Sequence, residues 1–233
     1  MHEISLFGQI SLGRHEQVSN ILAGLAAMQP SPFYEKHTLY MPKKTAISDA
    51  QIQKANKKPQ NVQPTYTHLI QSYSSTDYGK TLSPDGQKVR LVETPEPETK
   101  AFILRRVEES RATDDDMQKY SDTNKFQILH EYYVEGQRFT CRDIAISIYR
   151  HLLPQKPDEG AAEVKDDMVK LDDMKLLDPS GAFVVEATVR IDDRTKPALV
   201  QTATEELNWF RSEMKGSIDM RVPERLSLDT RVR

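Results

Sequence analysis

The sequence predicts a mainly β protein, a closed antiparallel β-barrel of about eight or more strands with two flanking α-helices. Two stretches, His2 to Leu12 and Phe183 to Ile191, alternate apolar and polar residues, which is the period of a strand with one buried face. The stretch from Phe126 to Leu152 is rich in strand-forming residues. Only two segments show strong helical spacing of apolar residues. A barrel hides the edges of its strands by closing, and a two-sheet sandwich is the second architecture that fits these observations.

The N-terminal part predicts a strand, a helix and a second strand. After the strand from His2 to Leu12, apolar residues from Val18 to Met28 recur at helical spacing, and the prolines that start at Pro30 end the helix. A strand from Phe33 to Met41 follows. The polar segment 42–64 contains several prolines and no apolar period, so we expect a mobile loop.

The middle of the chain predicts three further strands, at Tyr66 to Tyr73, Gln87 to Glu93 and Ala101 to Val107. The composition of Ser83-Pro84-Asp85-Gly86 is typical of a tight turn between the first two of them. Asp114-Asp115-Asp116 suits the start of a short helix, because acidic side chains are favourable at a helix N-terminus.

The stretch from Phe126 to Leu152 predicts a long central hairpin. Glu135-Gly136-Gln137 is expected to form its turn, since glycine reaches positive φ without steric cost. The apolar spacing slips by one residue between Cys141 and Ile144, which is typical of a β-bulge.

The C-terminal part predicts a loop, a strand and a helix. The acidic segment 154–179 is expected to be a second mobile loop, in which Val164 to Leu171 could hold a short helix. The strand Phe183 to Ile191 follows, and the final helix starts near Pro197 and ends at Gly216. We expect residues 1–233 to form one domain.

Composition excludes several classes of protein. The formal net charge of −3 provides no basic field for a nucleic-acid backbone, so no direct nucleic-acid binding is expected. One cysteine excludes an internal disulfide and fits a reducing compartment. No apolar run approaches the roughly 20 residues that a membrane helix needs, and the N-terminus does not have the pattern of a signal peptide.

The chain lacks the patterns of common catalytic sites. It contains no GxSxG, P-loop, GxGxxG or His/Cys cluster, so no catalytic residue, cofactor or metal site is expected. His37, His68 and His130 are interpreted as core or interface histidines. Cys141 is interpreted as a small buried hydrophobic residue, because no neighbour in the sequence would lower the pKa of its thiol.

One motif, Glu96-Pro97-Glu98-Thr99-Lys100, leaves an enzymatic alternative open. On a strand, ExExK spacing puts two carboxylates and an ammonium on one face, which suits Mg²⁺ and a polyphosphate. Pro95 and Pro97 place the motif in a loop instead, because proline cannot donate to a β-ladder. Other charged residues near or on the expected strands are assigned to outward-facing positions: Arg105, Glu131, Glu135, Arg142, Glu186 and Arg190. A divergent metal-dependent triphosphatase or polyphosphate hydrolase of the tunnel class is therefore the second function considered.

Three stretches resemble one protein family. They are HEISLFGQISLGRHEQVSNILAGLAAM running into PFYEKHTLY, then HEYYVEGQRFTCRDIAISIYRHL, and finally AFVVEATVR with a closing helix and the tail VPERL. In this order and spacing they are similar to subunit 18 of Mediator, the coactivator that links regulators to RNA polymerase II. The segments 42–64 and 154–179 depart from the family pattern as lineage-specific loops.

The resemblance implies a barrel similar to triphosphate-tunnel barrels, without their catalytic residues, acting as a non-catalytic subunit of the Mediator head module in the nucleus. It also implies a heterodimer with Mediator subunit 20, docking of the C-terminal helix of subunit 8, contact with other head-module subunits and an indirect link to RNA polymerase II. Independently of the family, Tyr132, Tyr133 and Phe139 are predicted to bind a partner, because aromatic side chains supply large contact area at interfaces.

Overall fold

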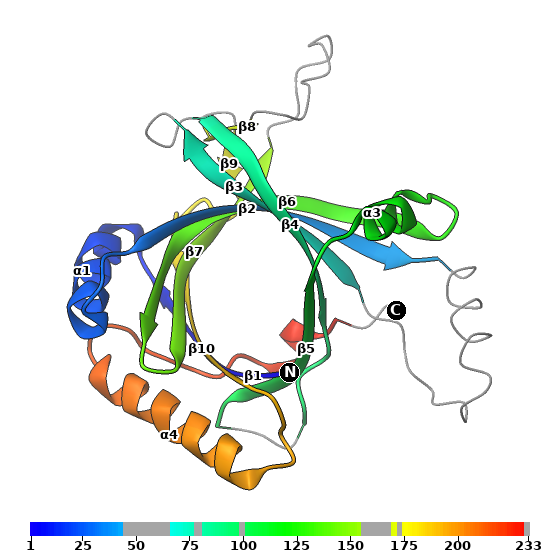
Figure 1. The fold of residues 1–233 in the computed structure, drawn as a ribbon. Helices are drawn as coiled ribbons and strands as arrows, with labels where there is room; N and C mark the ends of the chain where they lie inside the picture. Colours follow the sequence, from blue (N-terminus) through cyan, green and yellow to red (C-terminus); the bar gives the residue numbers. More distant parts are fainter. Residues whose placement is uncertain (44–65, 77–80, 98–100, 155–168, 172–173, 231–233) are drawn as a thin grey trace.

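The strands of this protein close into a barrel, and its helices lie on the outside (Figure 1). The structure is a computed structural model that describes residues 1–43, 66–76, 81–97, 101–154, 169–171 and 174–230. The barrel strands are β1 (His2–Ile10), β2 (Ser31–Pro42), β3 (Thr67–Thr76), β4 (Thr81–Val92), β5 (Ile103–Arg111), β6 (Phe126–Cys141), β7 (Ile144–Pro154) and β10 (Phe183–Ile191).

The barrel is antiparallel throughout. Its strand order is β10-β1-β5-β4-β3-β2-β6-β7, and pairing of β7 with β10 closes the ring. Two short strands lie off the ring: β8 (Val169–Lys170) pairs with β4, and β9 (Met174–Leu176) pairs with β7. The predicted barrel is thereby confirmed, and the sandwich is not formed.

Three α-helices accompany the described part of the barrel: α1 (His15–Ala26), α3 (Asp114–Ser121) and α4 (Pro197–Glu213). Short 3₁₀ turns, η1 (Leu12–Arg14) and η3 (Arg225–Leu228), lie before α1 and in the tail. The acidic start of α3 is confirmed, and Thr113 and Asp116 form a reciprocal capping box there. None of the described helices is long and apolar enough to cross a membrane.

The main apolar core lies between the barrel wall and the two larger helices. It is built from the outward-facing residues of β1, β6, β7 and β10, from the inner faces of α1 and α4, and from Leu104 of β5 and two residues of the tail, Ile218 and Met220. Its most deeply buried members include Ile4, Leu6, Leu22, Phe139, Ile146, Leu207 and Phe210. The residues of this core lie on the outer side of the barrel wall. The residues that alternate with them along the same strands therefore face the barrel interior.

The predicted hairpin turn at Glu135-Gly136-Gln137 is wrong. β6 runs straight through Gly136, and the turn lies at Arg142-Asp143, where Arg142 has φ 54°. Gly136 is needed for close packing instead, because a Cβ there would lie 2.2 Å from the Ile148 carbonyl oxygen. The slip in apolar spacing after Cys141 is the turn itself and not a bulge.

The predicted turn at Ser83-Pro84-Asp85-Gly86 is also wrong, because β4 continues through these residues. Ser72 pairs with Gly86 but Tyr73 pairs with Pro84, so the extra residue forms a bulge within the β3–β4 ladder. Proline is tolerated at such an irregular position. Most of the loops predicted at 42–64 and 154–179 lies outside the described residues, and Val169–Lys170 is a strand where a helix was considered.

Candidate functional site

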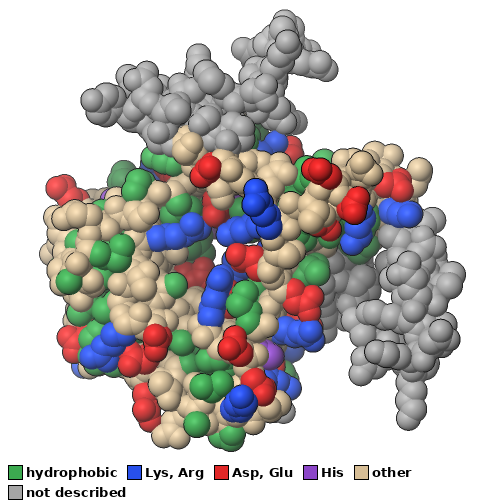
Figure 2. Space-filling model, viewed as in Figure 1, with side chains coloured by type: hydrophobic (Ala, Val, Ile, Leu, Met, Phe, Trp, Pro, Cys, Tyr) green, Lys and Arg blue, Asp and Glu red, His purple; other side chains and the backbone are tan. Residues whose placement is uncertain are grey.

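Charged and hydroxyl side chains line the barrel interior. Directly paired residues point to the same side of a sheet, and Glu3 lies opposite Arg190 on one neighbouring strand and Arg105 on the other. Ser5 and Thr188 likewise pair, with their hydroxyl oxygens 2.8 Å apart. Figure 2 shows acidic and basic side chains interspersed around the hollow at the centre of this view.

The outward assignment of Arg105, Glu186 and Arg190 is therefore wrong. Both sides of these strands are buried, the outer side by α1 and α4, so the apolar residues face the helices and the charged ones face inward. Arg142 does lie outside: its guanidinium carbon is 3.6 Å from the centre of the Trp209 ring on α4. Glu131 also pairs on the outer side, with Lys36 of β2.

Glu3 is the centre of the first interior cluster. The residue is 1% exposed, and its carboxylate lies 2.7 Å from Arg90, 3.1 Å from Arg190 and 3.5 Å from Arg105. Burial alone would raise the pKa of Glu3, but the three guanidinium groups outweigh burial and hold that pKa below its ordinary value. Glu3 therefore stays ionised and joins three other strands of the barrel.

Glu35 on β2 is the centre of the second interior cluster. Its carboxylate lies 2.8 Å from Arg138, 3.2 Å from His37 and 3.6 Å from Lys88. Burial opposes ionisation, yet the hydrogen bond from His37 and the charges of Arg138 and Lys88 move the pKa of Glu35 far below its ordinary value. Lys88 also lies 3.6 Å from Glu109, which connects the cluster to β5.

Aromatic and imidazole rings fill the space between the clusters. The Tyr132 ring stacks on His37 with centroids 5.0 Å apart and meets His151 edge-on at 5.3 Å. Burial raises the pKa of Tyr132 to about 12. Burial, with His37 and two arginines nearby, lowers the pKa of His68 to about 4, so this imidazole is neutral at physiological pH.

The basic side chains of the two interior clusters are paired with glutamates. Five basic side chains each lie between 2.7 and 3.6 Å from a glutamate oxygen: Lys88, Arg90, Arg105, Arg138 and Arg190. A polyphosphate would have to displace those glutamates before it could use the cations. Within the described residues, no group of three or more His, Cys, Asp or Glu side chains is placed to hold a metal ion. The arrangement is suited to fixing strands relative to one another.

Glu96, the first residue of the ExExK motif, is not part of this interior. Glu96 follows β4 in a loop, where its N–H donates to the Leu104 carbonyl at 2.8 Å and its carboxylate pairs with Arg194. The loop position agrees with the expectation from Pro95 and Pro97. Glu98 and Lys100 lie outside the described residues.

The three residues predicted to bind a partner lie in three different environments. Tyr132 lines the barrel interior, as described above. Tyr133 is 9% exposed and packs in an outer cluster with Tyr73 and Leu152. Phe139 is 1% exposed and lies in the main core. The structure does not bring them together, and their role as partner contacts stays a prediction.

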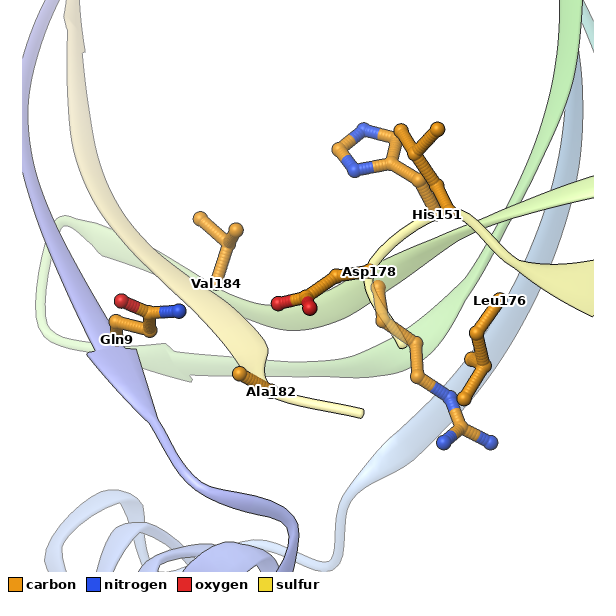
Figure 3. Close-up of a pocket in the computed structure, with 8 residues that line it drawn as sticks. Gln9, His151, Leu176, Asp178, Ala182 and Val184 are labelled. Atoms are coloured by element: carbon orange, nitrogen blue, oxygen red, sulfur yellow. The ribbon is translucent and has the colours of Figure 1, made fainter. Parts of the chain in front are cut away.

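A small cavity of about 70 Å³ opens beside β9 (Figure 3). Gln9 of β1 and Val184 of β10 form one wall, and Leu176, Asp178 and His151 lie around the other. Leu177, which also lines it, is 54% exposed. The sequence offered no signal for this cavity, because it forms where segments distant in sequence meet.

Comparison with known proteins gives a consistent match over the whole chain. The family described as "Med18 protein" matches residues 2–231. Mediator of RNA polymerase II transcription subunit 18 from Aspergillus oryzae is 24% identical over 273 aligned positions that cover 100% of both chains. The same subunit from Aspergillus fumigatus is 25% identical, again with 100% of both chains covered.

A solved structure has the same fold. A chain in the structure of the Schizosaccharomyces pombe Mediator head module superposes with a TM-score of 0.69 at 17% identity, and the match covers 96% of this chain and 99% of that one. The family match spans nearly every residue, and the chain belongs to the Med18 family.

Proposed function

We propose that this chain is a non-catalytic subunit of the Mediator head module, which binds partner subunits and helps to transmit regulatory signals to RNA polymerase II in transcription initiation. The observation that carries the proposal is the family match over residues 2–231. The pairing of the interior charges supports a structural role, because each basic side chain of the two clusters already lies against a glutamate.

The proposed partners follow from the family. They are Mediator subunit 20 as a heterodimer, the C-terminal helix of subunit 8 and further head-module subunits, with RNA polymerase II contacted indirectly, in the nucleus. The net charge of −3 supports protein partners over direct binding of nucleic acid.

Co-expression with subunits 8 and 20 of the same organism tests this function. We expect a stoichiometric complex that survives size-exclusion chromatography at micromolar concentration. Failure to recover that complex would contradict the proposed function. The matched control is co-expression with an unrelated barrel protein in place of subunit 20.

The role proposed for the aromatic residues can be tested in the same complex. Of Tyr132, Tyr133 and Phe139, Tyr133 is the most suitable because it lies on the outer side, at 9% exposure. Tyr133→Ala is expected to weaken the complex, and Tyr132→Phe, which changes only an interior hydroxyl, serves as the control. Unchanged binding of Tyr133→Ala would place the partner elsewhere.

The enzymatic alternative has its own assay. Release of phosphate from inorganic triphosphate with Mg²⁺ or Mn²⁺ is expected to be absent. If phosphate is released, and if the double variant Glu96→Ala, Glu98→Ala abolishes that release, the enzymatic function would be favoured over the structural one.

A further inference from the structure

Strands of a barrel overlap only partly, so their ends can be paired on one side alone. In this protein, short segments of the same chain cover several of these ends. Phe7 of β1 and Arg221 of the tail exchange two main-chain hydrogen bonds, at 2.9 and 2.6 Å. The short strands β8 and β9 cover the starting end of β4 and the final end of β7.

The N-terminal part of β6 is different. β2 pairs with β6 from Phe126 to Arg138, whereas β7 pairs with it only from Tyr133 to Cys141. On the side away from β2, the stretch Phe126–Tyr132, termed the β6 edge, therefore pairs with no strand of the described part of the chain. Among the described residues, only β2 forms main-chain hydrogen bonds to Gln127–Tyr132.

The side chains of the β6 edge do little to discourage pairing. Lysine, proline, inward charges and β-bulges normally protect an edge strand. The β6 edge contains no lysine, arginine or proline, but Leu129 forms a bulge where the register with β2 shifts. Ile128 lies opposite Tyr40 and is 52% exposed. The only acidic residue is Glu131, held on the outer side by Lys36 at 3.4 Å and Thr38 at 3.1 Å.

The exposed end of β5 shows the contrast. Glu108–Arg111 pairs with β4 on one side, and its sequence, Glu-Glu-Ser-Arg, carries charge at three of four positions. Such an end repels a further strand through the cost of desolvating its charges. The β6 edge offers an aliphatic side chain and unpaired main-chain groups instead.

We propose that the β6 edge is a docking site for an extended strand of a partner subunit. The inference rests on the proposed function, which supplies the partner subunits. N–H and C=O groups that point away from β2 at alternate residues are complementary to a strand and not to a helix, whose own main chain is satisfied internally. Beside Ile128 we expect an aliphatic residue of the incoming strand, and beside Glu131 a lysine or arginine.

Residue-resolved hydrogen exchange of the chain alone and of the purified complex with subunits 8 and 20 tests the site. Alternate amides of Gln127–Tyr132 should exchange rapidly in the isolated chain and become at least about tenfold slower in the complex. Amides already slow in the isolated chain would show that a segment of this chain covers the edge, and the proposal would be wrong. Rapid exchange in both samples would also overturn it.

If no complex forms, the proposed function fails as well, and that result is distinct from an intact complex with an unprotected edge.

A matched pair of variants gives an independent measurement. Ile128→Lys places a charge on the edge, whereas Leu226→Lys changes a side chain of the same 52% exposure in the tail. Both variants should melt like the parent chain. Ile128→Lys should weaken the complex by about tenfold or more, and Leu226→Lys by less than about twofold. Equal effects of the two variants, or none from Ile128→Lys, would contradict the proposal.

Discussion

The carboxylate of Glu3 lies 2.7 Å from the guanidinium of Arg90, although their strands β1 and β4 are separated by β5. The contact crosses the interior surface of β5, where Arg105 also reaches Glu3 at 3.5 Å. One side chain thus holds three consecutive strands at a fixed relative position. This geometry leads to a direct prediction about stability.

Glu3→Gln should strongly destabilise the protein. The amide keeps the shape of the side chain but removes the carboxylate charge that Arg90, Arg105 and Arg190 share, and loss of one partner of a buried ion pair typically costs about 3–5 kcal/mol. Urea unfolding followed by circular dichroism measures the loss. Glu96→Gln is the control, because the exposed pair with Arg194 is worth about 1 kcal/mol or less. Similar losses from both variants would contradict a special role for the interior cluster.

His68 should make the stability depend on pH. Its pKa is about 4 in the folded chain, below the ordinary value near 6.5, because burial disfavours the imidazolium. A depressed pKa contributes stability that is fully present above about pH 6.5 and is lost as the pH falls toward 4. The free energy of unfolding should therefore fall over this window, and less steeply in His68→Gln. A variant curve parallel to that of the parent chain would show that His68 does not titrate in this way.

Two glycine substitutions should have opposite effects on the stability of the fold. In Gly136→Ala the added methyl would lie 2.2 Å from the Ile148 carbonyl oxygen and 2.9 Å from the Phe33 ring, so the β6–β7 ladder must shift and stability falls. In Gly24→Ala the methyl meets nothing within 4 Å on α1, and the gain in helix propensity is about 0.5–1 kcal/mol. Thermal unfolding of the two variants decides the sign of each effect.

Arg142 should control the environment of Trp209. The chain has one tryptophan, so its fluorescence reports the contact between the β6–β7 turn and α4 without interference. Arg142→Gln removes the cation from the ring face and exposes the indole, so emission should shift to longer wavelength and acrylamide should quench it more strongly. Arg106→Gln, which alters an exposed pair on β5, should leave the emission unchanged. Unaltered quenching in Arg142→Gln would show that another group covers the indole.

Periodicity in the sequence was sufficient to predict the strands β1 and β10, the helices α1 and α4, and the barrel class, because each of these elements has one apolar side. It misplaced the central turn. Glycine is common in turns, but Gly136 lies within a strand, where the lack of a side chain leaves room for Phe33 and Tyr149. The turn residues Arg142 and Asp143 have no such composition.

The inward direction of the charges could not be predicted from alternation alone. Alternation separates the two faces of Phe183–Ile191 but does not say which one meets α4. The apolar face does, because the helices shield it, and Glu186 and Arg190 are left for the interior. The buried positions of Tyr132 and Phe139 have the same origin, since an aromatic residue on a strand fits a core and an interface equally well.

The pairing of β1 with β10 joins residues near the beginning of the chain to residues beyond position 180. A ribosome must therefore release most of the polypeptide before the ring can close, and until then β1 has no final neighbour on that side. Contacts of such long sequence separation form slowly. During synthesis, the first strand is thus exposed to other chains for longer than any other strand of the barrel.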